Sequence, residues 1–289
     1  MLSDDVRSFL RQYSIRLDKE LGQHFLINES ILGTIIETAK IKPGDRIIEI
    51  GPGIGILTRE LLKRGADVTA VELDERMLPL LQQFVQLKVN CQKLIVVHGN
   101  ALHTPLNPIP PYKVVANIPY AITSPLLRRL LLELPDRPTS LTLLIQREVA
   151  ETICAPTTEG ILNVLVRLCG TPTIIRNVPK DAFLPPPEVE SAILHIECLE
   201  QPLADRETIQ RILRLTKHAM SGRRKMLRNT VGSLPEGMDA LSKTGINPER
   251  RPQTLTVEEW MRLEKVFRDG TEITEKESKK PTKPRKPTN

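Results

Sequence analysis

From residue 42 to residue 145 the chain alternates short β-branched runs with segments of helical periodicity. The runs predict strands at residues 45–50, 67–72, 93–98, 112–117 and 140–145, and the segments predict helices at residues 56–64, 75–87 and 124–134. Strands that alternate with helices in this way are typical of a parallel, doubly wound sheet. Residues 188–198 alternate apolar and polar side chains, which predicts a later, antiparallel strand. We therefore expect an α/β fold.

The pattern changes after about residue 200, where strand signals end. Helical periodicity at residues 206–231, 236–243 and 256–268 predicts a small all-α domain. We therefore expect an α/β domain at residues 1–203, a helical domain at residues 204–270 and a tail at residues 271–289. The Pro- and Lys-rich end of this tail predicts disorder.

The formal net charge of +6 is unevenly distributed along the chain. Residues 206–228 contain eight Lys or Arg and one Glu, and residues 275–289 contain six Lys or Arg and two Glu. The rest of the chain carries a net charge of −5. A one-sided basic cluster can be a solvated helix face, or it can bind the phosphates of a nucleic acid. The charge pattern alone leaves both interpretations open.

Several classes of protein are disfavoured by composition and spacing. No run of 18 apolar residues is present, so we expect no membrane span, and the first residues lack the apolar segment of a secretory signal. The cysteines Cys91, Cys154, Cys169 and Cys198 are far apart and form no C-x-x-C pair. We therefore expect free thiols, no metal site and a cytoplasmic protein.

A glycine-rich turn, Glu49-Ile-Gly51-Pro-Gly53-Ile-Gly55, joins the first predicted strand to the next helix. Glycines allow a sharp turn and close approach of a ligand, and Glu72, at the end of the next strand, can accept hydrogen bonds from ribose hydroxyls. The spacing differs from the dinucleotide pattern G-x-G-x-x-G. It resembles the S-adenosylmethionine site of Rossmann-like methyltransferases. A nicotinamide-dependent oxidoreductase, or a plain tight turn with a surface Glu, is the alternative.

The stretch Asn117-Ile118-Pro119-Tyr120 ends the predicted fourth strand, at the sheet edge where open α/β folds bind ligands. An adenine amine is a weak nucleophile with two N–H donors, so a site that methylates it needs acceptors. The Asn117 side-chain oxygen and the Ile118 carbonyl can supply them. Pro119 would stiffen the turn and Tyr120 would stack on an extruded base. An ordinary Asn-x-Pro turn is the alternative.

Taken in order, these motifs resemble the ribosomal RNA adenine dimethyltransferases that act on small-subunit RNA. The matching segments are residues 21–26 (LGQHFL), 49–58 (EIGPGIGILT), 117–125 (NIPYAITSP), 146–150 (QREVA), 183–191 (FLPPPEVES) and 222–229 (GRRKMLRN). The resemblance covers about residues 18–267. It implies dimethylation of two adjacent adenines, with S-adenosylmethionine as cofactor and the small ribosomal subunit as partner. We expect a monomer.

The resemblance also implies roles for single residues. The catalytic residues would be Asn117, Ile118, Pro119, Tyr120 and Phe183, with Phe183 flanking the target base opposite Tyr120. The cofactor-binding residues would be Gln23, His24, Leu26, Gly51, Gly53, Gly55, Glu72, Leu73, Asn100, Ala101 and Asn117. The RNA-binding residues would be Arg223, Arg224, Lys225 and Arg228.

Two departures from the family pattern stand out. Asn100 replaces the usual Asp that contacts the cofactor adenine, and without the charge we expect a weaker hydrogen bond. Residues 158–160, Thr-Glu-Gly, replace a commoner aromatic-glycine pair.

Two related functions are alternatives. One is a nucleic-acid-binding factor derived from a methyltransferase, against which the intact Asn117, Pro119 and Tyr120 argue. The other is a large-subunit dimethyltransferase that gives antibiotic resistance, and the element at residues 223–229 favours the small-subunit branch over it.

Overall fold

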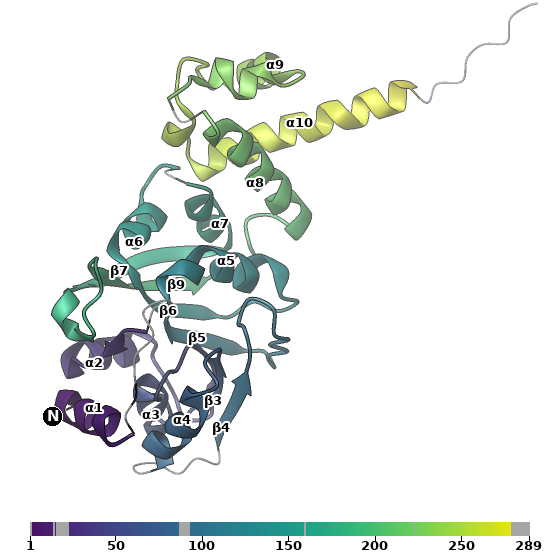
Figure 1. Ribbon diagram of the computed structural model, residues 1–289. Coiled ribbons are helices and arrows are strands. Elements are labelled where there is room, and N and C mark those ends of the chain that lie inside the picture. Colours follow the sequence, from purple (N-terminus) through teal and green to yellow (C-terminus); the bar gives the residue numbers. More distant parts are fainter. Residues whose placement is uncertain are drawn as a thin grey trace, which may run out of the picture. The chain divides into compact units, whose positions relative to one another are not determined.

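The structure, a computed structural model, describes residues 2–13, 15, 23–86, 93–158, 160–222 and 224–278, with side chains to residue 269. It divides into two compact units, one of Met1–Ala155 with Leu165–Leu203 and the other of Pro156–Val164 with Ala204–Asn289 (Figure 1). Residues 156–164, which the sequence pattern places in the α/β domain, therefore belong to the second unit. Several residues named above lie outside the described residues: residues 21–22 of the first motif, residue 87 at the end of a predicted helix, Cys91, Glu159, Arg223 and the end of the tail at residues 279–289.

The first unit is built on a seven-stranded sheet with the order β4-β3-β2-β5-β6-β9-β7. Its strands are β2 (Arg46–Ile50), β3 (Asp67–Glu72), β4 (Leu94–His98), β5 (Tyr112–Asn117), β6 (Ser140–Gln146), β7 (Gly170–Val178) and β9 (Ser191–Cys198). Strands β2 to β6 pair in parallel, and β9 lies antiparallel between β6 and β7. The predicted α/β fold and the predicted antiparallel strand are confirmed. The pattern did not predict β7, whose exposed polar residues and Pro172 suit its place at the sheet edge.

Amphipathic helices bury the faces of the sheet. They are α1 (Leu2–Gln12), α2 (Glu29–Thr38), α3 (Ile56–Lys63), α4 (Met77–Gln86), α5 (Thr123–Arg128) and α6 (Arg147–Cys154), while α7 (Ile161–Cys169) spans the boundary between the units. Fully buried Ile35, Leu61 and Leu81 of these helices form one core cluster with Val115 and Leu144 of the strands. The helix predicted at residues 124–134 is instead α5 followed by a short π-helix, η3 (Arg129–Glu133).

The strand order indicates where a ligand crevice lies. The chain runs from β2 to β3 and β4 on one side, then returns to β5 and β6 on the other. In an open α/β sheet, ligands bind at the carboxyl ends of the strands where the order reverses, here β2 and β5. A two-stranded antiparallel pair, β1 (Phe25–Leu26) with β8 (Phe183–Leu184), joins the N-terminal motif to the motif at residues 183–191.

The second unit is helical. It contains α8 (Arg206–Met220), α9 (Gly237–Lys243) and α10 (Val257–Ser278), with short 3₁₀ turns η5 (Leu227–Asn229), η6 (Val231–Ser233) and η7 (Pro252–Thr254) between them. The helix predicted at residues 206–231 ends at Met220, because a turn follows and the Leu227 N–H donates to the Arg250 carbonyl instead of to a helical partner. Among the helices described in either unit, none combines the length and hydropathy that a membrane span needs.

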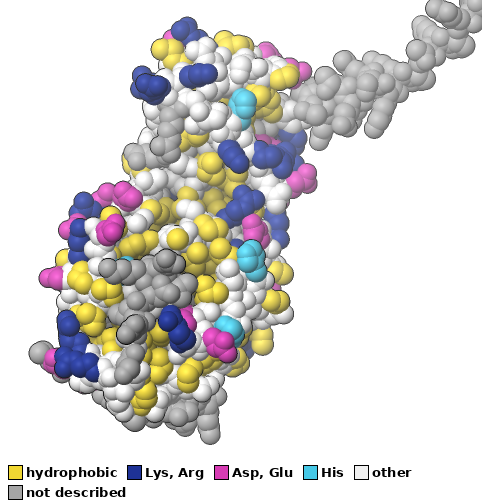
Figure 2. Space-filling model, viewed as in Figure 1, with side chains coloured by type: hydrophobic (Ala, Val, Ile, Leu, Met, Phe, Trp, Pro, Cys, Tyr) yellow, Lys and Arg dark blue, Asp and Glu magenta, His cyan; other side chains and the backbone are white. Residues whose placement is uncertain are grey.

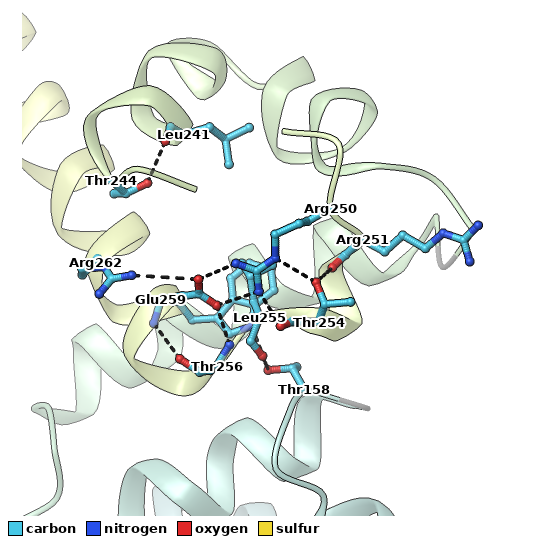
Figure 3. Close-up of polar contacts among 11 residues, drawn as sticks. Thr158, Leu241, Thr244, Arg250, Arg251, Thr254, Leu255, Thr256, Glu259 and Arg262 are labelled. Carbon is cyan, nitrogen blue, oxygen red and sulfur yellow. Dashed lines mark hydrogen bonds and ion pairs between the residues drawn. The ribbon is translucent and has the colours of Figure 1, made fainter. Parts of the chain in front are cut away.

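Hydrogen bonds explain why residues 156–164 belong to this unit. Thr158 Oγ1 donates to the Leu255 carbonyl at 2.7 Å (Figure 3). Trp260 Nε1 donates to the same Oγ1 at 2.9 Å. Both Thr158 and Trp260 are fully buried, so these bonds satisfy groups that water cannot reach. They join two segments that are about a hundred residues apart in the sequence. Sequence periodicity carries no information about contacts between segments so far apart in the chain.

Candidate functional site

A cavity of about 830 Å³ opens at the carboxyl ends of β2, β3 and β5. It lies within the first unit, at the point where the strand order reverses. The residues that we named from the sequence and that line it are Gln23, His24, Leu26, Gly51, Gly53, Glu72, Leu73, Asn100, Ala101, Asn117, Ile118, Pro119 and Tyr120. The fold thus brings together five segments of the chain that are separated by up to about a hundred residues.

The glycine turn forms one wall of the cavity in a conformation that favours glycine. Gly51 and Gly53 have φ values of +67° and +56°. A Cβ atom on Gly53 would lie 2.6 Å from Cε1 of Phe25, which also lines the cavity, and one on Gly51 would lie 3.5 Å from Cδ of Pro119. The turn therefore packs closely against both the N-terminal motif and the turn after β5.

Glu72 is fixed beside this turn. Its Oε2 accepts the Gly53 N–H at 2.9 Å, and its Oε1 accepts the Asp74 N–H at 2.8 Å. The side chain is buried, and burial raises the pKa of its carboxyl despite these two donors. Each carboxylate oxygen can accept a second hydrogen bond, so Glu72 retains acceptor capacity toward a ligand in the cavity.

Glu49 is a site residue that the sequence pattern did not single out. It belongs to β2, is 1% exposed and lines the cavity. Burial raises the pKa of its carboxyl to about 8, and the nearby Glu72 adds to this shift. Its Oε2 has no hydrogen-bond partner among the described residues. The signal in the sequence is its position at the start of the glycine-rich motif, as a lone carboxylate in an otherwise apolar strand end, Ile-Ile-Glu-Ile.

Asn117 ends β5 with a fixed side-chain amide. Its Nδ2 donates to the backbone carbonyl of His24 at 2.9 Å. A carbonyl oxygen can only accept, so the NH₂ group must face His24 and the amide oxygen must face away. Asn117 therefore presents an acceptor, not a donor, on the remaining side of the amide.

Tyr120 lies in a network of aromatic and polar contacts. Its hydroxyl is hydrogen-bonded to Ser191 Oγ at 2.6 Å, and its ring lies 6.1 Å from the His24 ring at an interplanar angle of 19°. His24 is held in turn by a 2.8 Å contact between its Nδ1 and the Pro185 carbonyl. Burial raises the pKa of the Tyr120 phenol, which therefore stays neutral at physiological pH. Ser191 is buried at the end of the motif at residues 183–191 and was not predicted to act in the site.

Comparison with known proteins identifies this arrangement. A model of the ribosomal RNA adenine dimethylase family matches residues 15–269, nearly the whole of the described chain. The chain belongs to this family. Two similar curated proteins are both named ribosomal RNA small subunit methyltransferase A. The one from Dehalococcoides mccartyi is 38% identical over 272 residues, 91% of this chain and 92% of that protein. The one from Clostridium botulinum is 38% identical over 276 residues, 92% of this chain and 99% of that protein.

Solved structures give the same result for the fold. A dimethyladenosine transferase from Plasmodium falciparum superposes with a TM-score of 0.73 at 28% identity, covering 86% of this chain and 98% of that one. The 23S rRNA methyltransferase ErmE superposes with a TM-score of 0.67 at 27% identity, covering 83% of this chain and 98% of that one. The Rossmann-like methyltransferase fold expected from the sequence is confirmed.

In this dimethylase, two residues that we expected in the site lie away from the cavity. Phe183 is 1% exposed and packs in the hydrophobic core beside its ladder partner Leu26. It is not among the residues that line the cavity, and its place opposite Tyr120 stays a prediction. Gly55 instead begins α3, and a Cβ atom there would lie 2.8 Å from Cγ2 of Val85, so this glycine allows α3 and α4 to pack.

The basic residues predicted to bind RNA in this family are in the second unit. Arg224, Lys225 and Arg228 are exposed, and Arg228 is paired with Glu249 at 2.6 Å. Figure 2 shows several Lys and Arg side chains on this unit, some of them beside Asp or Glu. Arg211 is different, because it pairs with the buried Glu264 at 2.5 Å and holds α8 to α10.

Arg250 and Arg251 are two neighbouring cations of the same unit whose side chains are oriented differently. In Figure 3 the Arg250 guanidinium lies against Glu259, at 2.6 Å, whereas the Arg251 side chain extends away from the other labelled residues.

Proposed function

We propose that this chain transfers methyl groups from S-adenosylmethionine to the N6 amine of adenines in small-subunit ribosomal RNA and so takes part in ribosome biogenesis. Membership of the ribosomal RNA adenine dimethylase family supports the reaction, and the names of the curated relatives support the small subunit over the large one. Two adjacent adenines, each dimethylated, are the expected targets.

The residues around the cavity fit S-adenosylmethionine. The glycine turn lines the cavity, and Glu72 beside it has acceptor capacity for ribose hydroxyls. S-adenosylmethionine also carries an ammonium and a sulfonium, and Glu49 offers a buried carboxyl with an unpartnered oxygen on the same wall. When bound, the cofactor supplies an electrophilic methyl group, for which no covalent enzyme intermediate is required.

The orientation of the Asn117 amide is the observation that carries the proposal. With Nδ2 held by His24, the Asn117 oxygen is available to accept one N–H of the target amine, and the carbonyl of Ile118, which also lines the cavity, would accept the other. Two acceptors direct the nitrogen lone pair toward the methyl group and stabilise the positive charge that develops on the amine. Pro119 stiffens this turn, and Tyr120, with its hydroxyl anchored on Ser191, offers a face for the extruded base.

The exposed basic residues of the second unit are suited to the RNA backbone. Arg224 and Lys225, together with Arg223 and Arg228, would neutralise phosphates and position the RNA without reading its sequence. We further infer that the chain acts as a monomer in the cytoplasm. The free thiols of Cys154, Cys169 and Cys198 are compatible with a reducing compartment.

The proposal is tested by incubating the full chain with S-adenosylmethionine and ribosomal subunits from cells that lack this modification. We expect mass spectrometry of RNA fragments to find dimethyladenosine in the small-subunit RNA and none in the large-subunit RNA. Methylation of large-subunit RNA alone would assign the chain to the other branch. Tight binding of both cofactor and RNA without any methyl transfer would favour the nucleic-acid-binding factor.

A further inference from the structure

Arg129 is a buried cation that the proposed reaction does not use. It begins η3, directly after α5, and its side chain is 9% exposed. Its Nη2 donates to the Thr104 carbonyl at 2.6 Å, and its Nη1 donates to the Ala101 carbonyl. No carboxylate pairs with it among the described residues. Its buried guanidinium is therefore satisfied by backbone carbonyls of a single loop.

That loop, residues 99–104, is one helical turn. The Asn100 carbonyl accepts the N–H groups of His103 and Thr104 at 2.9 and 2.8 Å, and the Asn100 side-chain oxygen caps the Leu102 N–H at 2.9 Å. Asn100 thus satisfies donors at the start of the turn. Arg129 satisfies acceptors at its end, where a positive charge also interacts favourably with the peptide dipoles.

The same loop forms part of the cavity wall, through Asn100 and Ala101. The Asn100 oxygen is already committed to Leu102, and the side chain carries no charge, so the strength of its contact with a ligand depends on where the backbone holds it. Arg129 is well suited to hold it, because the guanidinium is a rigid, planar fork that fixes two acceptors at once. A loop ordered in advance avoids the entropy cost of ordering on binding.

We propose that Arg129 is a positioning residue that fixes the loop at residues 99–104 and thereby sets the affinity for S-adenosylmethionine. The inference rests on the proposed function, together with the family resemblance, which implies that Asn100 contacts the adenine of the cofactor. Arg129 also lies near the proposed catalytic turn in the sequence, nine residues after Tyr120. Its hydrogen bonds therefore connect the segment that follows this turn to the loop that forms part of the cavity wall.

The test compares Arg129→Gln, Arg129→Lys and the control Arg128→Gln in the full chain. Arg128 is the neighbouring residue, and its side chain is half exposed and paired with Glu133 of the following helical turn. We expect Arg129→Gln to raise the calorimetric Kd for S-adenosylhomocysteine about tenfold or more, a change typical of removing charged hydrogen bonds. Turnover at saturating S-adenosylmethionine should stay close to that of the wild type. Arg129→Lys, with one compact donor group, should be intermediate.

Hydrogen exchange gives a second readout in case Arg129→Gln also lowers stability. The amides of residues 102–104 should exchange faster in this variant, while those of β3 and β5 keep their protection. An unchanged Kd in a folded Arg129→Gln variant, or a fall in turnover with no change in Kd, would overturn the inference. If the wild type itself failed to bind S-adenosylhomocysteine, the proposed function would fail instead.

Discussion

The side-chain amide of Asn117 donates to the backbone carbonyl of His24, 93 residues earlier in the chain, at 2.9 Å. This bond determines which end of the amide is free to meet a substrate. It also ties the turn after β5 to the N-terminal motif, so the acceptor for the target amine and one wall of the cofactor cavity are held by the same contact.

Replacing Asn117 tests this relationship. Asn117→Ala removes the acceptor and should lower methyl transfer at saturating cofactor at least about tenfold, or about 1.4 kcal/mol in the activation barrier. Asn117→Asp is the sharper variant, because it places a carboxylate oxygen against the His24 carbonyl, where the NH₂ group was, and should not restore activity. Single-turnover rates with saturating cofactor measure both. Wild-type turnover in either variant would disprove the assigned role.

The bond between Tyr120 and Ser191 makes a separate prediction. Tyr120→Phe leaves the buried Ser191 hydroxyl unpaired, which typically costs about 1–3 kcal/mol, and Ser191→Ala leaves the partly buried Tyr120 hydroxyl without this partner. Because both substitutions remove the same bond, the double variant should lose less free energy of unfolding than the sum of the two single variants. Urea titration of the four proteins measures this coupling. Strict additivity would show that the hydroxyls do not interact.

Gly53 can be compared with a matched glycine elsewhere in the unit. Gly53→Ala puts a Cβ atom 2.6 Å from Phe25 at a φ of +56°, so it should lower stability and weaken cofactor binding. Gly33, in α2, has open space around its Cα, and Gly33→Ala should stabilise the helix by up to about 1 kcal/mol. Thermal unfolding and calorimetric titration give both quantities. Equal effects of the two substitutions would contradict the close packing of the turn.

The buried carboxyl of Glu49 should make stability depend on pH. Its pKa of about 8 in the folded chain lies above the ordinary value of 4.5, so the folded state holds a proton that the unfolded state has lost. The free energy of unfolding should therefore fall as pH rises from about 4.5 to 8, by up to about 1.4 kcal/mol per pH unit from this group.

Glu49→Gln should remove that contribution, so that the variant loses less stability than the wild type between pH 5 and about pH 8. Urea unfolding across this range checks the slope. Glu37→Gln, at an exposed position of α2, serves as the control and should leave the slope unaltered. The same pH dependence in the wild type and in Glu49→Gln would mean that Glu49 ionises normally.

The basic residues of the second unit are tested by salt dependence. Replacing Arg223, Arg224 and Lys225 by Ala should weaken RNA binding and reduce the slope of log K against log salt by about 0.7–0.9 for each phosphate that is no longer neutralised. Lys243→Ala, which removes a cation paired with Asp239 at 2.6 Å, should change the slope much less. Filter binding at several salt concentrations distinguishes the outcomes. An unaltered slope in the triple variant would assign these residues to a solvated helix face.

The sequence alone determined the features that depend on local order. Alternating β-branched and helical segments determined the parallel part of the sheet, and the strand order then placed the glycine turn, Glu72 and the stretch Asn117–Tyr120 at one edge. Periodicity and glycine spacing report short-range backbone preferences, which is why these predictions are confirmed as positions in the fold.

Tertiary structure decided the rest, because side-chain direction depends on partners far away in the chain. Phe183 packs in the core cluster, and packing of α3 on α4 keeps Gly55 out of the cavity lining. The His24 carbonyl orients Asn117, and burial, with the nearby Glu72 adding to it, raises the pKa of Glu49. Motifs place a residue at a site, but long-range contacts determine which of its atoms the site presents.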